Sequence, residues 1–317
     1  MIVRKLGKSG LAVAPLAFGG NVLGWTADES ASFKVLDAFV AAGLNLIDTA
    51  DVYSRWVPGH QGGESETILG KWMKARGNRS RVIIATKVGM EMGPAEQGLS
   101  RAYIMRAVER SLTRLQTDYI DLYQSHRDDP GTPFEESLGA YGDLIRAGKV
   151  RAIGASNFTA ERLAAALAAS AAHGLPRYET LQPLYNLYDR SSFEGELAAL
   201  CRREQLGVIP YFSLASGFLT GKYRTEADLA GRARGYRVKD MLNERGLRIL
   251  RALDEVSREL RATPAQVSLA WLIARGVTAP IASATSVEQM QVLAGSVLLQ
   301  PGPDALARLD AASAPQE

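Results

Sequence analysis

The 317-residue sequence contains one cysteine, Cys201, and no uncharged apolar run near the roughly 20 residues that span a bilayer. A single cysteine excludes an internal disulfide and a thiolate-rich metal site, so we expect no bound metal and a reducing compartment. The basic start of the chain, Met1 to Gly10, does not resemble an export signal. These absences predict a cytoplasmic protein with no membrane partner.

The sequence also lacks a large excess of either charge. Lysine and arginine number 37 and aspartate and glutamate 34, which gives a net charge of +3. Because the two signs are mixed along the chain, no block indicates a nucleic-acid or membrane partner. The composition, 46% hydrophobic and 22% charged, is typical of a folded protein. We expect residues 1–317 to form a single domain.

No G-x-G-x-x-G motif follows the first predicted strand, so the common dinucleotide-binding fingerprint is missing. Instead, a predicted hairpin at 2–14 precedes about eight strand–helix units, the number that closes a (β/α)8 TIM barrel. We expect the hairpin to cap the N-terminal end of this barrel. The predicted strands are 14–18, 44–48, 81–87, 118–125, 149–156, 178–184, 206–212 and 277–283. The predicted helices are 29–42, 64–75, 101–115, 133–147, 159–172, 192–205, 264–275 and 286–294.

Four polar residues stand at or just beyond the ends of successive predicted strands, where the active sites of such barrels form. Asp48 ends one strand and Tyr53 follows it, Lys87 ends the next strand, and His126 follows the third. Each has an ordinary structural explanation when taken alone, such as a turn cap or a solvated strand end. Together they form a set that can deliver a proton to a carbonyl oxygen.

The chemistry of these four side chains predicts their roles. A tyrosine hydroxyl has an ordinary pKa near 10 and needs a cation to stabilise its phenolate, which Lys87 can supply to Tyr53. Asp48 would keep Lys87 charged, and a neutral His126 would donate a hydrogen bond to the developing alkoxide. None of these groups delivers a hydride, so a reduced nicotinamide is expected.

Six blocks of the sequence resemble signature blocks of the aldo-keto reductase superfamily, over about residues 3–295. The blocks are LNLIDTADVYS, VIIATKVG, TDYIDLYQSHRDD, GKVRAIGASNF, LQPLYNL and PYFSLASGFLTGKY. The last is also similar to the bacterial branch that contains inositol-cluster oxidoreductases. The resemblance implies an enzyme that interconverts carbonyls and alcohols of small-molecule substrates. It makes Asp48, Tyr53, Lys87 and His126 a catalytic tetrad with Tyr53 as the general acid.

The same resemblance implies a set of cofactor-binding residues. Ser156, Asn157 and Gln182 match residues that hydrogen-bond the nicotinamide carboxamide, and Tyr211 matches the ring that stacks on it. For Ser156 and Asn157, capping of the following helix is the alternative. The remaining residues that we assign to the cofactor are Gly20, Asn21, Leu214, Ser216, Lys222, Ser283, Thr285 and Gln289.

The sequence gives opposing indications about the dinucleotide. Many relatives carry lysine or arginine where this chain has Ser283, Thr285 and Gln289, which weakens the case for a strict NADP preference. The long segment 213–239 carries six cations among glycines, which suits a flap over phosphate groups. We therefore expect NADP(H) to be favoured and NAD(H) to be used as well.

The role of two tryptophans, two alternative functions and the identity of the substrate stay open at this point. Trp25 and Trp56 either line a substrate pocket or only pack loops against the scaffold. A lyase with a Schiff base on Lys87 is an alternative function, although Asp48 opposes it by keeping the amine protonated. The second alternative function is a cofactor-binding regulatory subunit that resembles channel β subunits. The sequence does not indicate which carbonyl or alcohol is the substrate.

Overall fold

The computed structural model describes residues 3–315, and its central feature is an eight-stranded parallel sheet. The strands lie in the order β10-β3-β4-β5-β6-β7-β8-β9, so each strand from β3 to β9 lies beside its neighbour in sequence. The strands are β3 (Ala17–Gly19), β4 (Leu46–Asp48), β5 (Ile83–Val88), β6 (Ile120–Ser125), β7 (Val150–Ser156), β8 (Tyr178–Gln182), β9 (Gly207–Val208) and β10 (Ile281–Ala282).

Backbone hydrogen bonds join the two ends of this strand order. The amide of Thr278, ahead of β10, donates to the Val208 carbonyl at 2.7 Å, and the amide of Ile281 donates to the Pro210 carbonyl at 3.0 Å. The Thr278 hydroxyl accepts from the Val208 amide at 3.0 Å. The sheet therefore returns on itself, which confirms the predicted (β/α)8 barrel.

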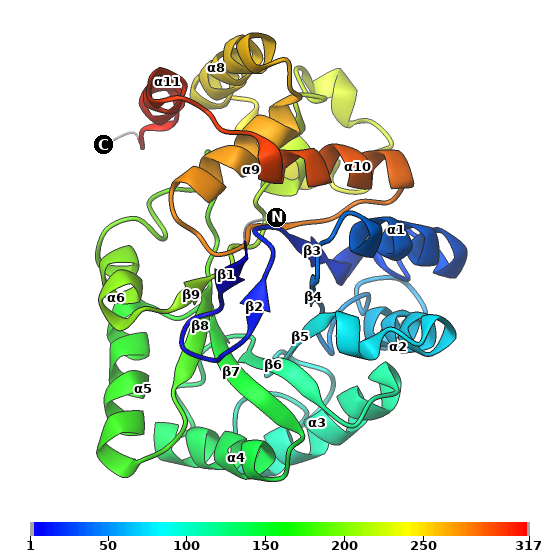
Figure 1. The fold of residues 1–317 in the computed structure, drawn as a ribbon, viewed down its shortest axis with the longest axis vertical. Helices are drawn as coiled ribbons and strands as arrows, with labels where there is room; N and C mark the ends of the chain where they lie inside the picture. Colours follow the sequence, from blue (N-terminus) through cyan, green and yellow to red (C-terminus); the bar gives the residue numbers. More distant parts are fainter. Residues whose placement is uncertain (1–2, 316–317) are drawn as a thin grey trace.

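Helices follow the strands and surround them on the outside (Figure 1). Several begin at the side-chain caps that favour helix starts, such as Asp28, Ser100 and Thr159. Among residues 3–315, no helix is both long and apolar enough to cross a membrane. The helices of the repeating units are α1 (Glu29–Ala41), α2 (Glu64–Arg76), α3 (Arg101–Leu115), α4 (Phe134–Arg146), α5 (Ala160–His173), α6 (Glu196–Glu204), α9 (Pro264–Ala274) and α10 (Val287–Gly295).

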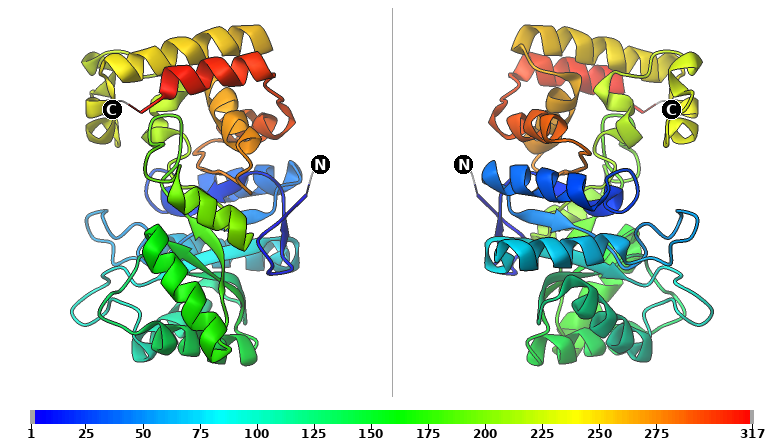
Figure 2. Two further views of the ribbon diagram at one scale, coloured as in Figure 1. Left: turned by 90° about the vertical axis from the view of Figure 1, so that its left-hand side faces the viewer. Right: turned by 90° about the vertical axis from the view of Figure 1, so that its right-hand side faces the viewer.

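The predicted hairpin is present and consists of the antiparallel strands β1 (Arg4–Lys5) and β2 (Ala12–Val13). Its Leu6, Leu11 and Val13 are buried in one cluster with apolar residues of the barrel interior. Gly7 lies at φ 62°, and a Cβ there would stand 2.1 Å from the Glu179 carbonyl oxygen, so a larger residue would clash. The hairpin closes one end of the barrel, and the loops after β4 and β5 protrude on the opposite side (Figure 2).

The structure contains two helices that the sequence analysis did not anticipate. These are α8 (Glu244–Leu260), capped by Asn243, and α11 (Pro303–Ser313), which packs against it. Short elements also interrupt the segments expected to be irregular. They are η1 (Gly20–Val22), η2 (Arg79–Arg81), η3 (Ala215–Thr220), η4 (Glu226–Leu229), α7 (Gly235–Val238), η5 (Lys239–Met241) and η6 (Ser296–Leu298).

Several strands are shorter than predicted. The predicted strand 206–212 pairs regularly only over Gly207–Val208, because Pro210 has no amide to donate and Phe212 turns to a positive φ of 52°. Tyr211 therefore lies beyond the end of β9, in the loop that follows this strand.

Candidate active site

The structure brings the four tetrad residues together at the loop side of the barrel. Asp48 is the last residue of β4, Lys87 lies in β5, and His126 directly follows β6. Because parallel strands end at one edge of the barrel, these side chains meet. Tyr53 reaches the same place from the turn after β4.

Lys87 is the centre of the cluster, and its side chain is fully buried. Its ammonium donates to Asp48 Oδ2 at 2.7 Å, to the Thr49 carbonyl at 2.8 Å and to the Tyr53 hydroxyl at 2.8 Å. All three protons of the ammonium are thus engaged. This arrangement opposes nucleophilic attack by Lys87, which needs a free lone pair.

Asp48 is a buried carboxylate with both oxygens hydrogen-bonded. Besides Lys87, Oδ2 accepts a 3.3 Å bond from the Tyr53 hydroxyl. Oδ1 accepts from Gln182 at 2.8 Å and from Gln124 at 3.3 Å. The sequence analysis did not identify Gln124, because its burial and its place beside Lys87 in the strand register are known only from the structure. These bonds fix the carboxylate beneath Lys87.

The electrostatics of the cluster leave Tyr53 protonated at neutral pH. Burial, followed by the charge of Asp48, raises the pKa of Tyr53 well above its ordinary value. Burial also lowers the pKa of Lys87, and Asp48 opposes this shift. The phenol therefore has a proton to donate, and the Lys87 ammonium lies against the oxygen that would become negative.

His126 presents a neutral imidazole beside Tyr53. Burial and then the charges of Lys87 and Arg127 lower the pKa of His126 well below its ordinary value. Its Nδ1 has no hydrogen-bond partner among residues 3–315. The His126 and Tyr53 rings meet edge to face with centroids 6.1 Å apart. An imidazole in this state can donate or accept a hydrogen bond toward a neighbouring oxygen.

The four residues expected at the nicotinamide form one hydrogen-bonded chain next to the tetrad. The Tyr211 hydroxyl donates to Asn157 Oδ1 at 2.8 Å, and Asn157 Nδ2 donates to the His126 carbonyl at 2.9 Å. Ser156 Oγ donates to the Gln182 carbonyl at 2.9 Å. Helix α5 is capped by Thr159, so the alternative role of Ser156 and Asn157 as its N-cap was wrong.

The remaining residues assigned to the cofactor lie in two groups. Ser283 Oγ donates to Asn21 Oδ1 at 2.7 Å, next to Gly20 in η1, and Gln289 Oε1 accepts from the Thr285 amide at 3.0 Å. Leu214 and Ser216 begin η3, where left-handed φ values of 56° at Ser216 and 97° at Gly217 break the helix. Turned backbone of this kind is typical of anion-binding concavities. Lys222 is exposed, with Nζ 5.0 Å from the Tyr223 ring centroid.

Trp56 lies beside Tyr53, and Trp25 lies beside Trp56. Their rings contact edge to face with centroids 5.5 Å apart, and the Trp56 centroid is 6.1 Å from that of Tyr53. Trp56 is 48% exposed, which is high for a tryptophan that only packs a loop. A pocket-lining role for these two tryptophans stays a prediction.

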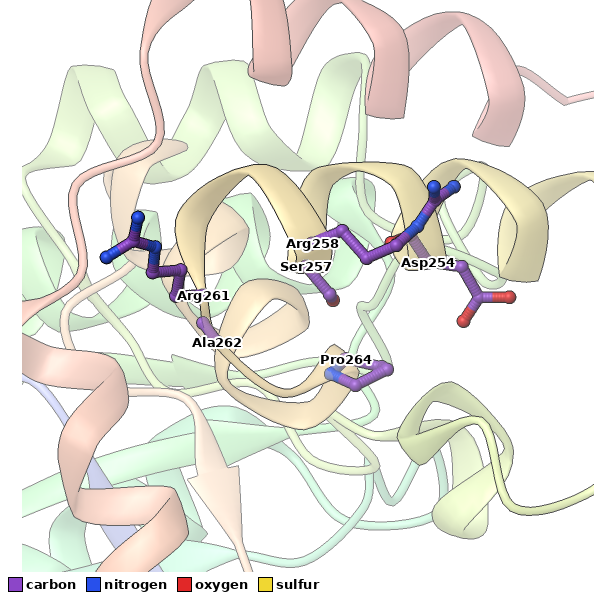
Figure 3. A pocket seen from close by; sticks show the side chains of 6 residues that line it. All are labelled: Asp254, Ser257, Arg258, Arg261, Ala262 and Pro264. Atoms are coloured by element: carbon purple, nitrogen blue, oxygen red, sulfur yellow. The ribbon is translucent and has the colours of Figure 1, made fainter.

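A surface hollow elsewhere on the molecule contains none of the predicted site residues. It lies between the end of α8 and the start of α9 (Figure 3). Its lining consists of Asp254, Ser257, Arg258, Arg261, Ala262 and Pro264. The chemistry-bearing residues of the sequence analysis therefore belong to the strand ends and not to this hollow.

Asp51 is a second buried carboxyl near the tetrad, which the sequence analysis did not identify. It is 2% exposed, and neither carboxyl oxygen has a hydrogen-bond partner among residues 3–315. Burial, followed by the charge of Glu66, raises the pKa of Asp51 to about 8. Asp51 therefore carries a proton at neutral pH.

Replacing Asp51 by asparagine should remove a pH dependence of stability. The folded-state pKa of about 8 lies above the ordinary value near 3.9, so the folded protein binds more protons than the unfolded chain between these values. Stability is therefore lost as the pH rises through this window, by at most roughly 1.4 kcal/mol per pH unit. Urea unfolding of wild type from about pH 5 to 8 should show this decline, and Asp51→Asn should flatten it. Equal slopes for the two proteins would contradict the assignment.

Comparisons with known proteins agree with this arrangement. A sequence profile of the Aldo/keto reductase family matches residues 15–314. The uncharacterized oxidoreductase YrpG of Bacillus subtilis is 37% identical over 294 residues, which cover 90% of this chain and 88% of the relative. Protein tas of Escherichia coli is 33% identical over 340 aligned positions, which cover 98% and 97%. Aldo-keto reductase AFTS1 of Alternaria alternata is 33% identical and covers 91% and 85%. The chain therefore belongs to the aldo/keto reductase family and is an oxidoreductase of carbonyl and alcohol groups.

Proposed function

We propose that this protein is an NAD(P)(H)-dependent carbonyl reductase and alcohol oxidoreductase in which Tyr53 donates the proton. One observation carries the proposal. The Lys87 ammonium lies 2.8 Å from the Tyr53 hydroxyl and 2.7 Å from Asp48, inside a buried cluster at the ends of the strands. No other described arrangement on this barrel combines an acid, its stabilising cation and an anchor for that cation.

In this mechanism the substrate carbonyl oxygen binds against the Tyr53 hydroxyl. As negative charge develops on that oxygen, the hydroxyl bond of Tyr53 breaks and its proton bonds to the oxygen, which yields the alcohol. The Lys87 ammonium stabilises the phenolate left on Tyr53, because its hydrogen bond already points at that oxygen. Asp48 holds the ammonium in place. Alcohol oxidation follows the same path in reverse.

His126 would orient the substrate. Its neutral imidazole can hydrogen-bond the carbonyl oxygen without adding a second cation next to Lys87. Trp25 and Trp56 supply the apolar walls beside the same position. These contacts place the carbonyl so that proton transfer from Tyr53 needs little rearrangement.

The residues present fit a nicotinamide dinucleotide. Ser156, Asn157 and Gln182 are the amides and hydroxyl that a carboxamide requires, and the half-buried ring of Tyr211 stands beside them. When bound, the reduced cofactor supplies the hydride that none of the protein's side chains can provide. Leu214, Ser216 and Lys222 on one side, and Gly20, Asn21, Ser283, Thr285 and Gln289 on the other, would hold the rest of the dinucleotide.

A screen of carbonyl and alcohol substrates with reduced and oxidised cofactors tests this proposal directly. We expect turnover of some aldehydes or ketones, followed by the absorbance of the reduced nicotinamide. Tight nucleotide binding with negligible turnover across the panel would instead favour a cofactor-binding regulatory subunit. Trapping of a carbonyl substrate on Lys87 by borohydride would favour the lyase, which the three hydrogen bonds of Lys87 oppose.

We expect both dinucleotides to be used, with NADP(H) favoured by about 10- to 100-fold in kcat/KM, or roughly 1.4–2.8 kcal/mol. The segment 283–289 contains no lysine or arginine, and Glu288 adds a carboxylate at the start of α10. The basic segment 222–239 can supply cations to a 2′-phosphate. Parallel kinetics with both cofactors at one substrate concentration measure the ratio. A preference for NAD(H), or an inability to use NAD(H) at all, would contradict this prediction of dual use with NADP(H) favoured.

A further inference from the structure

The basic segment 222–239 contains one partly buried arginine that has no counter-ion among residues 3–315, whereas Arg232 and Arg237, which also lack one, are exposed. Arg224 makes a two-pronged ion pair with Asp254, at 2.9 and 2.7 Å. Lys239 Nζ lies 3.8 Å from Glu226 Oε2, and Arg237 Nε donates to the Tyr236 hydroxyl at 2.9 Å. The Arg234 side chain makes no hydrogen bond or ion pair with any residue in 3–315, and its buried Nη2 has no partner there.

Arg234 lies next to Trp25, close to the candidate active site. Its guanidinium carbon lies 5.1 Å from the centroid of the Trp25 ring. Trp25 contacts Trp56, and Trp56 contacts Tyr53, so a continuous series of ring contacts connects Arg234 to Tyr53. The positive charge of Arg234 also acts on Tyr53, where it opposes the rise in pKa caused by burial and Asp48.

The surroundings of Arg234 make an unpaired charge costly. Burial, followed by the nearby charge of Arg237, lowers the pKa of Arg234. A guanidinium that has lost part of its water and has no acceptor for Nη2 gains most from an anion, because it can donate two parallel hydrogen bonds to a carboxylate or phosphate. The cation–π contact with Trp25 restrains the guanidinium before such a ligand arrives.

We propose that Arg234 binds an anionic group, a carboxylate or phosphate, on the substrate, close to the carbonyl that Tyr53 protonates. This inference rests on the proposed function and names the substrate class for the same site. The phosphates of the dinucleotide offer the same chemistry. The contact of Arg234 with Trp25, which is connected to Tyr53 through Trp56, assigns the anion to the substrate.

The test compares 4-carboxybenzaldehyde with its methyl ester, which differ mainly in one negative charge. In wild type, kcat/KM for the acid should exceed that for the ester at least about tenfold. Arg234→Gln should lower kcat/KM for the acid by about 10- to 100-fold and leave the ester and the dissociation constants of both dinucleotides within about twofold. Arg251→Gln, which removes an exposed cation of α8, is the matched control and should preserve the preference for the acid.

Two results would overturn the inference. The first is equal kcat/KM for acid and ester in wild type. The second is a parallel loss of kcat/KM for both substrates in Arg234→Gln with weaker dinucleotide binding, which would assign Arg234 to the cofactor phosphates.

If wild type reduces neither aldehyde, calorimetric titration with benzoate tests the anion site separately from the proposed function. Saturable binding that Arg234→Gln abolishes supports the anion site, and absence of binding to wild type refutes it.

Discussion

Replacing Tyr53 by phenylalanine should lower kcat for carbonyl reduction by about 10²–10⁴-fold, the usual contribution of a general acid. The substitution keeps the ring and its contacts with Trp56 and His126, and removes only the hydroxyl that Lys87 contacts at 2.8 Å. Since that hydroxyl acts in the transition state, the affinity for the dinucleotide should change little. Steady-state rates and a fluorescence titration with the cofactor measure the two effects.

Tyr119→Phe is the matched control, because Tyr119 precedes β6 at the other end of the barrel, where it packs against Arg79. It should keep wild-type turnover. If Tyr53→Phe also kept turnover near the wild-type value, the proton would have to come from another group, and the proposed role of Tyr53 would be lost.

Replacing Lys87 by methionine should be damaging in two separate ways. Turnover should fall by a factor comparable to that of Tyr53→Phe, because the phenolate loses the cation that stabilises it. Stability should fall by about 3–5 kcal/mol, because the buried Asp48 carboxylate keeps its charge and loses its counter-ion. Denaturant unfolding, run beside the kinetic assay, measures the second effect.

The double variant Asp48→Asn with Lys87→Met separates stability from catalysis. It removes both charges, so it should recover part of the lost stability while remaining inactive. Recovery of turnover together with stability would mean that Lys87 supports only the fold. A Lys87→Met protein with wild-type stability would show that Asp48 is not held as a buried carboxylate by this ion pair.

Much of the fold follows from the sequence because its signals are local. The alternation of apolar strands and helices predicts the barrel, and Asp48 and Lys87 stand out because strand ends are where charge is otherwise scarce. Parallel strands end at one edge, so residues far apart in the chain can be expected to meet there. The barrel was therefore predictable as a whole, while the contacts within the site come from the structure.

What the sequence analysis missed depends on contacts rather than on local pattern. Gln124 and Asp51 are ordinary polar residues until their burial and neighbours are known. The place of Arg234 depends on the path of an irregular segment, which no periodicity encodes. Helix α8 differs, because its buried Ile249, Leu250, Leu253 and Val256 have helical spacing that was visible in the sequence and was overlooked beside the basic, glycine-containing stretch before it.

The hairpin at the closed end of the barrel bears on how this protein would behave as an immobilised biocatalyst. The first described residues enter that hairpin, and the loops after β4 and β5 open on the opposite side (Figure 2). A bead or electrode linked through the exposed Lys8 of the hairpin would therefore face the closed end of the barrel and leave the loops toward the bulk solution. Coupling through the exposed Lys222, one of the residues proposed to hold the dinucleotide, would instead burden the proposed cofactor site.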